Sequence, residues 1–593
     1  GKKIYFLSDR TGSGQVWSAA PSGNNLAQVT DIEGGVEGFS VSPSGDRILY
    51  IKRVPVVKRS SSELYSDLGR SKAKIYDDLM ERHWDYWDDG SYLHLFVADM
   101  AGRVTGGTDI MEGEPWDAPL APYFDASEIV WNHAGTQLAY TCKKLTGTQY
   151  ALSTDSDIYL YDVASGRTSN LTEGMPGYDK YPVFSPDDSM IAFTSMERPG
   201  NESDKDRLFV MSLADGSKRY LTEGFDYNAG NVRWADDSTL LFLSPIRATI
   251  QLCSVSLSGG PVRVITSGAH DLNAFSAAGG RVVAEMTTLG SPTELFDVNP
   301  SDGAMTRITN TNAEIYEHIR MGKVEERWVE TTDGKRMLVW VVLPPDFDPS
   351  KKYPALLYCQ GGPQSVVSQF WSYRWNLQLM AAQGYVVVAP NRRGLPSFGQ
   401  EWLDQISGDY SGQNIRDYLS AIDDVSAEPW VDRDRLGCVG ASYGGYSVFF
   451  LAGNHQKRFK AFIAHCGMFN FESMYGATEE LWFPNNDLGG PYWSDSPVAR
   501  RSYANSPHKF VKNWDTPILI FSGQRDFRIP YTESLQAFTA ARLMGVPSRL
   551  VSFEDEAHQV FKPQNSLVWN REFFSWLDRY VKNAETPAEQ TGR

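Results

Sequence analysis

The stretch Leu436-Gly437-Cys438-Val439-Gly440-Ala441-Ser442-Tyr443-Gly444-Gly445 decides the fold of the C-terminal half of this 593-residue chain. An apolar, strand-like run leads directly into a serine, and Tyr446 to Leu451 then has the pattern of a helix. A sharp turn from strand to helix strains the serine backbone and tolerates only small neighbours, which the glycines supply. The stretch therefore predicts a nucleophile elbow in which Ser442 is the reactive group.

The residues around this elbow alternate between apolar strands and helical segments. Continuous apolar runs are typical of parallel strands that are covered on both faces. Such runs occur at 354–359, 385–389, 436–439, 461–464 and 518–521. A doubly wound sheet with a serine elbow predicts an α/β-hydrolase domain, which we place at residues 319–593.

Two further side chains are needed to make the serine reactive. A serine hydroxyl is a weak nucleophile unless a histidine accepts its proton, and in this fold an acid and then the histidine follow the serine along the chain. His558 ends a strand and a polar turn, where a loop presents it above the sheet, and Asp526 follows the run 518–521 by a few residues. We therefore predict Ser442, Asp526 and His558 as the catalytic residues.

Attack of the serine on a carbonyl creates an oxyanion, which backbone N–H groups must stabilise. Tyr443 supplies one of them as the residue after the nucleophile. The turn Gln360-Gly361-Gly362-Pro363 follows another strand, and its glycines permit close approach of the backbone. We assign the second donor to Gly362, with Gly361 as the alternative.

The N-terminal half contains a repeat. Leu-Thr or Ile-Thr endings place Thr172, Thr222, Thr266 and Thr309 at spacings of 50, 44 and 43 residues. This period is the size of a four-stranded blade and favours a β-propeller over residues 1–318, with a β-sandwich as the alternative.

Six copies of the repeat are visible, and the first looks incomplete. We expect about seven blades, the seventh of which needs residues that precede Gly1. An insert near residues 59–90 interrupts the repeat and is expected to be partly helical around Tyr76 to Trp87.

The composition excludes several classes of function. A formal net charge of -17 without a cluster of Lys and Arg disfavours nucleic acid and anionic membrane surfaces as partners. No apolar run is long enough to span a membrane. The five cysteines lie in or beside apolar runs without a Cys-x-x-Cys pair, which indicates buried free thiols. Neither a His-Glu-x-x-His zinc signature nor a phosphate-binding loop is present, so we expect no metal and no cofactor.

Several motifs together resemble the prolyl oligopeptidase family, and the resemblance spans nearly the whole chain. They are Gln360-Gly361-Gly362-Pro363, Asn391-Arg392-Arg393-Gly394, Gly440 to Gly445, Gly523-Gln524-Arg525-Asp526 and Glu556-Ala557-His558. Within that family the chain is most similar to the dipeptidyl-peptidase V and acylaminoacyl-peptidase branch, and the insert at 78–90 looks like one in dipeptidyl-peptidase V. Members of this branch carry histidine where this chain has Gln360, so another group must order the turn.

The resemblance implies a serine exopeptidase that releases N-terminal dipeptides from short peptides through an acyl-enzyme, with entry limited by the propeller. It also implies a preference for a hydrophobic or small residue before the scissile bond and places Arg528 near the substrate backbone. The paired-glutamate motif that binds the substrate amine in dipeptidyl-peptidase IV is not found, and Glu81 or Asp85 is the candidate replacement. The implied pocket residues, besides Arg528, are Tyr443, Phe469, Phe471, Tyr475 and Ile529.

Two other functions remain open from the sequence. One is an acylaminoacyl peptidase with the same catalytic residues, and the other is an inert binding protein, which the ordered presence of Ser442, Asp526 and His558 disfavours. The resemblance further implies peptide substrates and a periplasmic or secreted location, and a homodimer is an additional expectation.

Overall fold

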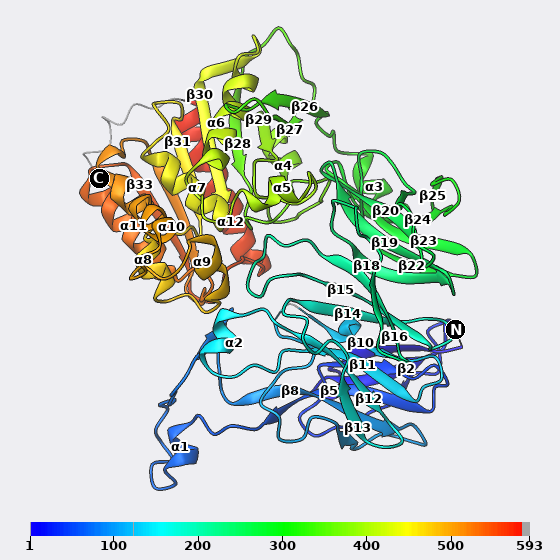
Figure 1. Ribbon diagram of the computed structural model, residues 1–593. Coiled ribbons are helices and arrows are strands. Elements are labelled where there is room, and N and C mark those ends of the chain that lie inside the picture. Colours follow the sequence, from blue (N-terminus) through cyan, green and yellow to red (C-terminus); the bar gives the residue numbers. More distant parts are fainter. Residues whose placement is uncertain (1, 123, 584–593) are drawn as a thin grey trace.

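The computed structural model describes residues 2–122 and 124–583 of the chain. A set of N-terminal antiparallel sheets lies against a C-terminal sheet that is covered by helices (Figure 1). The predicted boundary at residue 318 falls between α3 (Ala313–Tyr316) and β26 (Val324–Glu330). The outer ends of the two predicted domains, residue 1 and residues 584–593, lie outside the described residues.

The C-terminal sheet has eight strands in the order β26-β27-β29-β28-β30-β31-β32-β33. Strand β27 pairs antiparallel with β26 and β29, and the later pairs are parallel, as the continuous apolar runs predict. The other strands are β27 (Arg336–Val342), β28 (Tyr353–Cys359), β29 (Val386–Pro390), β30 (Val431–Ala441), β31 (Ala461–His465), β32 (Ile518–Gly523) and β33 (Ser548–Phe553). The helices are α4 (Leu377–Ala382), α5 (Gln400–Asp404), α6 (Gln413–Ser426), α7 (Tyr443–Ala452), α8 (Phe471–Tyr475), α9 (Trp482–Asp487), α10 (Pro497–Ala504), α11 (Tyr531–Leu543) and α12 (Pro563–Leu577).

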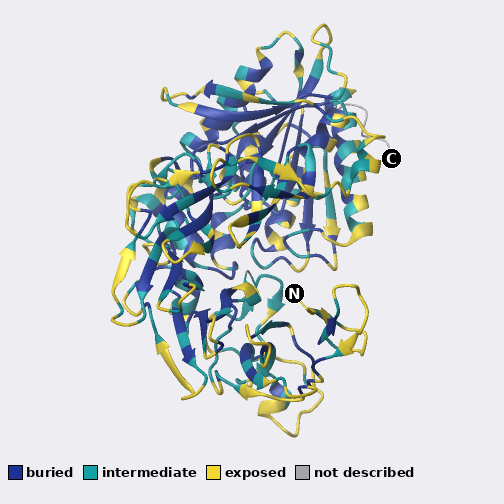
Figure 2. Ribbon diagram, turned by 90° about the vertical axis from the view of Figure 1, so that its right-hand side faces the viewer, coloured by how far each residue is buried: buried dark blue, intermediate teal, exposed yellow. Residues whose placement is uncertain are grey.

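Both faces of this sheet are buried, which explains why its strands do not alternate between apolar and polar residues. In β28, Leu357 and Cys359 belong to one hydrophobic cluster, whereas Leu356 and Tyr358 belong to the cluster on the opposite face. Figure 2 shows the central strands as the most continuously buried part of the molecule. The rigid sheet therefore fixes the loops at the carboxyl ends of its parallel strands.

The N-terminal half consists of antiparallel sheets that follow one another in chain order. The first has three strands, β1 (Ile4–Ser8), β2 (Gln15–Ala19) and β3 (Ala27–Gln28). The next three have four strands each: β4 (Gly38–Val41), β5 (Arg47–Pro55), β8 (Ser91–Asp99) and β9 (Thr108–Asp109); β10 (Ile129–Trp131), β11 (Gln137–Cys142), β12 (Asp157–Asp162) and β13 (Arg167–Asn170); and β14 (Asp179–Phe184), β15 (Met190–Ser195), β16 (Arg207–Ser212) and β17 (Lys218–Tyr220).

The last N-terminal sheet contains eight strands but divides into two units. Strands β20 and β22 are joined by a single parallel pair, Ile250 with Asp271. Six units of three or four strands thus follow in chain order, in agreement with six visible repeats and an incomplete first one. The strands are β18 (Gly230–Asp236), β19 (Thr239–Ile246), β20 (Thr249–Ser256), β21 (Arg263–Val264), β22 (Asp271–Ala278), β23 (Arg281–Thr288), β24 (Ser291–Val298) and β25 (Met305–Arg307).

The marker threonines of the repeat have one structural role. The hydroxyl of each accepts a hydrogen bond from the backbone N–H of the residue 14 positions earlier, at 2.8 to 3.1 Å, and so fixes the outer part of its sheet. The bonded pairs are Ile158 with Thr172, Leu208 with Thr222, Leu252 with Thr266 and Leu295 with Thr309, and Thr30 of the first repeat bonds Val16 in the same way. The repeat in the sequence therefore arises because the same hydrogen bond recurs in successive sheets.

The insert differs from the sequence-based expectation of helix around Tyr76 to Trp87. Its helical turn is α1 (Ser61–Leu64), where Ser60 and Glu63 form a capping box. Residues 82–87 instead form a hairpin of β6 (Arg82–His83) and β7 (Tyr86–Trp87). Trp84 turns the chain with a φ of 55°, which a right-handed helix cannot include. The expectation of helix there was wrong.

The structure also bears on the cysteines and on membrane insertion. All five cysteines are buried and free, as their apolar surroundings predict. Within residues 2–122 and 124–583, no helix combines the length and the apolar character that crossing a bilayer requires. The short helix α2 (Thr148–Leu152) packs against α9 and helps to join the two halves.

Candidate active site

The predicted elbow forms at the junction of β30 and α7. Ser442 lies between them with φ 59° and ψ -122°, a strained conformation for a residue with a side chain. Its backbone N–H donates to the carbonyl of His465 at 2.9 Å, which fixes the turn to the neighbouring strand. A Cβ on Gly440 would lie 2.6 Å from the carbonyl oxygen of Gly444, and one on Gly444 would lie 2.0 Å from that of Cys359. Close backbone packing therefore explains the glycines.

Gly444→Ala is expected to destabilise the protein by about 2 kcal/mol or more, because an added methyl group overlaps backbone that cannot move freely. Gly230→Ala is a matched control, since a Cβ there meets nothing within 4 Å, and its effect should stay within about 0.5 kcal/mol. Urea unfolding of both variants measures the difference. Equal unfolding free energies would contradict this account of the elbow.

The structure brings the three predicted catalytic side chains into one hydrogen-bonded chain. His558 Nε2 lies 3.0 Å from Ser442 Oγ, and His558 Nδ1 lies 2.7 Å from Asp526 Oδ2. The other oxygen of Asp526 accepts from the backbone N–H of Ile529 at 2.9 Å. Asp526 is 1% exposed and His558 is 7% exposed, so little water competes for these bonds. The two side chains come from the loops after β32 and β33.

Opposing effects set the pKa of His558. Burial disfavours the imidazolium and lowers the pKa, but the charge of Asp526 and its neighbour Cys466 outweigh burial and raise the pKa to about 10. Cys466 Sγ lies 3.9 Å from His558 Nε2. The site therefore stabilises the protonated ring, which is the state that forms when His558 takes a proton from Ser442.

The predicted oxyanion donors belong to the start of α7 and to the turn after β28. Tyr443 is the first residue of α7, so its N–H is at the positive end of that helix. Gly361 and Gly362 both line the cavity beside Ser442, and a Cβ on Gly361 would lie 3.5 Å from that of Ser442. Gly362 has a φ of +107°, which requires glycine. The choice between the two glycines stays a prediction.

Gln360, at which the family resemblance leads us to expect histidine, is ordered by its neighbours. Tyr358 OH donates to Gln360 Oε1 at 2.6 Å, and Gln360 Nε2 donates to Ser365 Oγ at 3.1 Å. These two hydrogen bonds hold the side chain within the turn.

A buried arginine of the resemblance motif at 391–394, to which the sequence analysis gave no role, joins the two oxyanion segments. Arg392 donates to the carbonyl of Pro363 at 3.1 Å, and its guanidinium lies 4.6 Å from the ring centre of Tyr443. The resemblance motif at 391–394 therefore has a structural reason, because it holds the turn at 360–363 against the start of α7.

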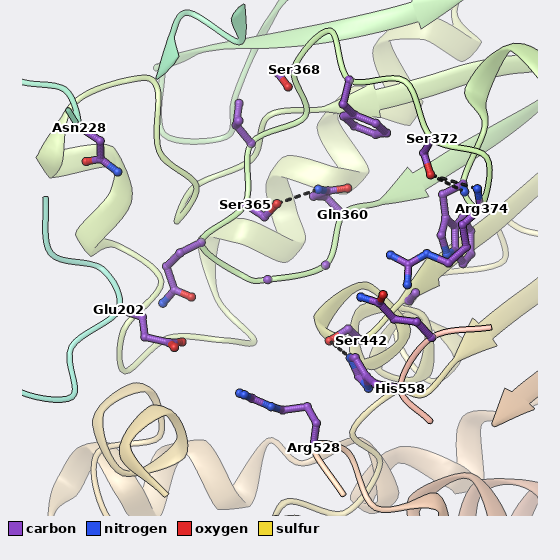
Figure 3. Close-up of a pocket in the computed structure, with 18 of the residues that line it drawn as sticks. Glu202, Asn228, Gln360, Ser365, Ser368, Ser372, Arg374, Ser442, Arg528 and His558 are labelled. Carbon is purple, nitrogen blue, oxygen red and sulfur yellow. Dashed lines mark hydrogen bonds between the residues drawn. The ribbon is translucent and has the colours of Figure 1, made fainter. Parts of the chain in front are cut away.

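Ser442 opens into a cavity of about 830 Å³ between the two halves of the molecule (Figure 3). One wall comes from the turn at 360–366, the segment 368–375 and the loops of Cys466 and His558, and the other from the N-terminal sheets. The N-terminal residues on the wall are Trp84, Tyr178, Lys180, Met196, Glu202, Asp204, Asp206, Asn228, Ile250, Asp271 and Asn273.

The structure places the pocket residues that the family resemblance implies in two different environments. Arg528 lines the cavity, where its guanidinium pairs with Glu479 and Glu480. The others are at most 5% exposed and lie in one hydrophobic cluster behind the elbow, not on the cavity wall. They are Tyr443, Phe469, Phe471, Tyr475 and Ile529.

The insert reaches the catalytic residues, but not through its acids. Glu81 is paired with Arg82 and Asp85 faces Arg525 at 3.9 Å, and neither lines the cavity. Trp84 does so instead, with its ring centre 5.3 Å from that of His558. Its carbonyl accepts from the backbone N–H of Phe527 at 3.0 Å, so the insert packs directly on the loop of Asp526.

Two groups of side chains in the described part of the chain have donor atoms close enough to share a metal ion. One is Cys466 with Asp526 and His558, whose geometry a hydrogen-bonded chain to Ser442 already explains. The other is His83 with Glu479 and Glu480, and both of these carboxylates pair with Arg528. Neither arrangement requires a metal.

Comparisons with known proteins agree with this geometry. Residues 371–584 match the model of the prolyl oligopeptidase family. The chain is 51% identical to dipeptidyl-peptidase 5 of Porphyromonas gingivalis over 98% of this chain and 85% of that protein. It is 46% identical to dipeptidyl-peptidase 5 of Porphyromonas endodontalis, over 98% of this chain and 84% of that protein.

Solved structures show the same fold. An acylaminoacyl peptidase from Pyrococcus horikoshii superposes with a TM-score of 0.82 at 21% identity, over 99% of this chain and 88% of that one. This likeness extends over both halves of the molecule. With its elbow, its family match and relatives that are about half identical over almost its full length, the chain belongs to the prolyl oligopeptidase family.

Proposed function

We propose that this protein is a serine exopeptidase that releases dipeptides from the N-terminus of short peptides. The observation that carries the proposal is the hydrogen-bonded chain from Ser442 through His558 to Asp526, which opens into the cavity between the two halves. The relatives named dipeptidyl-peptidase 5 support the release of dipeptides in particular.

The proposed reaction follows from this geometry. Ser442 Oγ attacks the carbonyl carbon of the second residue while His558 takes its proton, and N–H groups of Tyr443 and Gly362 stabilise the oxyanion. His558 then gives the proton to the leaving amine, which leaves an acyl-enzyme on Ser442. A water molecule that His558 deprotonates attacks the acyl-enzyme and releases the dipeptide.

The N-terminal sheets are proposed to form a β-propeller of about seven blades that limits the cavity to short peptides. The six successive units and the repeated threonine bonds support this proposal. Domain limits at 1–318 and 319–593 are part of it. A length series of peptides tests it, because turnover should fall as the peptide outgrows the cavity.

We also propose a hydrophobic or small residue before the scissile bond. Apolar side chains on the cavity wall, among them Val366, Phe370 and Trp375, support this preference over a charged residue. Arg528 on the cavity wall is proposed to bind the peptide backbone of the substrate.

A substrate panel tests the proposed activity. Wild-type protein should release the coumarin from Gly-Phe-amidomethylcoumarin and should react with a fluorophosphonate probe. Preferential turnover of N-acetyl-Phe-amidomethylcoumarin would identify an acylaminoacyl peptidase instead, and absence of labelling would indicate an inert binding protein. Export from the cytoplasm and homodimer formation stay predictions, which cell fractionation and light scattering test.

A further inference from the structure

One positively charged side chain on the wall of the catalytic cavity is left without a partner. Of the lysine and arginine side chains there, Lys180 lies 3.0 Å from Asp206, and Arg528 pairs with two glutamates. Arg374 lines the same cavity. Within the described part of the chain its guanidinium makes neither a hydrogen bond nor an ion pair, and it lies 5.7 Å from the ring centre of Phe561. Its N–H donors therefore remain for a ligand.

The groups around Arg374 do not balance its charge. Burial disfavours the guanidinium and lowers the pKa of Arg374, against the smaller opposing effects of Cys466 and Tyr358. Burial also raises the pKa of Tyr358 and lowers that of His465, so this phenol and this imidazole stay uncharged at neutral pH. A cation in such surroundings is stabilised when an anionic ligand binds beside it.

The backbone that carries Arg374 is held in place. Ser372 Oγ accepts hydrogen bonds from the backbone N–H groups of Arg374 and Trp375, at 3.1 and 3.0 Å (Figure 3). The ring centre of Trp375 lies 5.1 Å from that of Trp569 and 5.8 Å from that of Phe573, both on α12. The side chain of Arg374 therefore extends from a fixed point of the cavity wall.

Arg374 lies near the atom that protonates the leaving group. Cys466, whose thiol is close enough to influence the charge of Arg374, has its Sγ 3.9 Å from His558 Nε2. That nitrogen gives its proton to the leaving amine, so the leaving group begins beside it. Figure 3 shows Arg374 and Arg528 on opposite sides of Ser442, which separates the leaving side from the side of Arg528.

The length of the leaving group decides where its carboxylate lies. An extended chain advances about 3.3 to 3.6 Å per residue, so the carboxylate of a leaving group of one or two residues lies within about 7 Å of its amine. Such a carboxylate stays in the part of the cavity that Arg374 lines, whereas that of a longer leaving group lies beyond it.

The facing wall of the cavity disfavours a carboxylate. The N-terminal half contributes Glu202, Asp204, Asp206 and Asp271 to this wall, and the formal net charge of the chain is -17. A guanidinium binds a carboxylate through two parallel N–H···O bonds, which fix the orientation of the carboxylate as well as attract it. Arg374 therefore offers a free carboxylate a favourable place in a cavity with an acidic facing wall.

We infer that Arg374 binds the C-terminal carboxylate of the leaving fragment, so that tripeptides and tetrapeptides with a free carboxylate are favoured over longer or amidated peptides. The inference rests on the proposed function and names the subsite for the part of the peptide that departs. Arg374 is then a specificity-determining residue on the leaving side of Ser442.

Two tripeptides that differ only at the C-terminus test this assignment. Gly-Phe-Ala ends in a carboxylate and Gly-Phe-Ala-amide does not, and liquid chromatography measures release of Gly-Phe from both. Arg374→Met should lower kcat/KM for the acid by roughly 10- to 100-fold, the loss expected of a charge-assisted, bidentate hydrogen bond. Turnover of the amide and of Gly-Phe-amidomethylcoumarin should change less than about twofold, because neither substrate has a carboxylate.

Two further variants and a longer pair of peptides complete the experiment. Arg374→Lys keeps the charge without the planar fork and should retain part of the preference for the acid. Arg500→Met is the matched control, because Arg500 is an exposed arginine of α10, and it should leave all substrates unchanged. Gly-Phe-Ala-Ala and its amide show whether the loss in Arg374→Met is larger for a leaving group of one residue or of two.

Equal losses for acid and amide in Arg374→Met would indicate a structural role and overturn the assignment, as would an unchanged ratio of the two in both peptide pairs. The proposed function is judged separately on the wild type with Gly-Phe-amidomethylcoumarin. If that protein releases Gly-Phe while Arg374→Met keeps the wild-type ratio of acid to amide, the carboxylate subsite fails and the exopeptidase stands. If the wild type releases no dipeptide, both fail.

Discussion

Ser442→Ala is expected to lower kcat for dipeptide release by on the order of 10⁶-fold, the loss seen when the nucleophile of a catalytic triad is removed. The variant deletes the atom that His558 Nε2 contacts at 3.0 Å and leaves the cavity walls in place. Steady-state assays with Gly-Phe-amidomethylcoumarin measure kcat. Labelling by a fluorophosphonate probe should also be lost in this variant.

The fold of this variant should be intact, because alanine fits the elbow as well as serine does. Circular dichroism and the urea unfolding midpoint provide the control. A folded Ser442→Ala protein that retains more than about 1% of wild-type kcat would contradict the proposed chemistry, since the oxyanion donors alone leave far less activity.

The sequence predicted the C-terminal site because its constraints are local. The strained turn at Ser442 needs small neighbours, and the order of nucleophile, acid and base follows from the order of strands in the sheet. The repeat of the threonines also depends on a short-range contact, because each threonine hydroxyl accepts a hydrogen bond from a backbone N–H only 14 residues earlier. Short-range features of this kind can be predicted from one sequence.

The parts that the sequence did not predict depend on contacts between distant segments. Glu202 and Trp84 reach the cavity from the N-terminal half, and no spacing relates either residue to Ser442. The hairpin at 82–87 escaped detection because Trp84 makes a turn with positive φ, which is usually left to glycine or asparagine. Phe469 and Phe471 were assigned to a pocket by resemblance, whereas the structure places them in the core, where most aromatic side chains of this kind lie.

Asp526→Asn is expected to lower kcat/KM by about 10⁴-fold, because an asparagine at this position leaves the imidazole without the charge that stabilises its protonated form and its correct tautomer. The 2.7 Å contact with His558 Nδ1 and the 1% exposure of Asp526 make this charge effective. Steady-state kinetics of Asn, Glu and wild-type proteins measure the loss. If Asp526→Glu keeps more activity than Asp526→Asn, the negative charge contributes to catalysis beyond the shape of the side chain.

The same variant should shift the pH profile in a defined direction. His558 acts as a base when neutral, so kcat/KM rises with pH through the pKa of His558 in the free enzyme. Burial lowers that pKa, whereas Asp526 and Cys466 raise it in the wild type, so loss of the Asp526 charge leaves the effect of burial less opposed. The acidic limb of the residual kcat/KM profile should therefore move to lower pH in Asp526→Asn. An unchanged or higher apparent pKa would mean that Asp526 does not set the protonation of His558, and the large loss of rate would then require another cause.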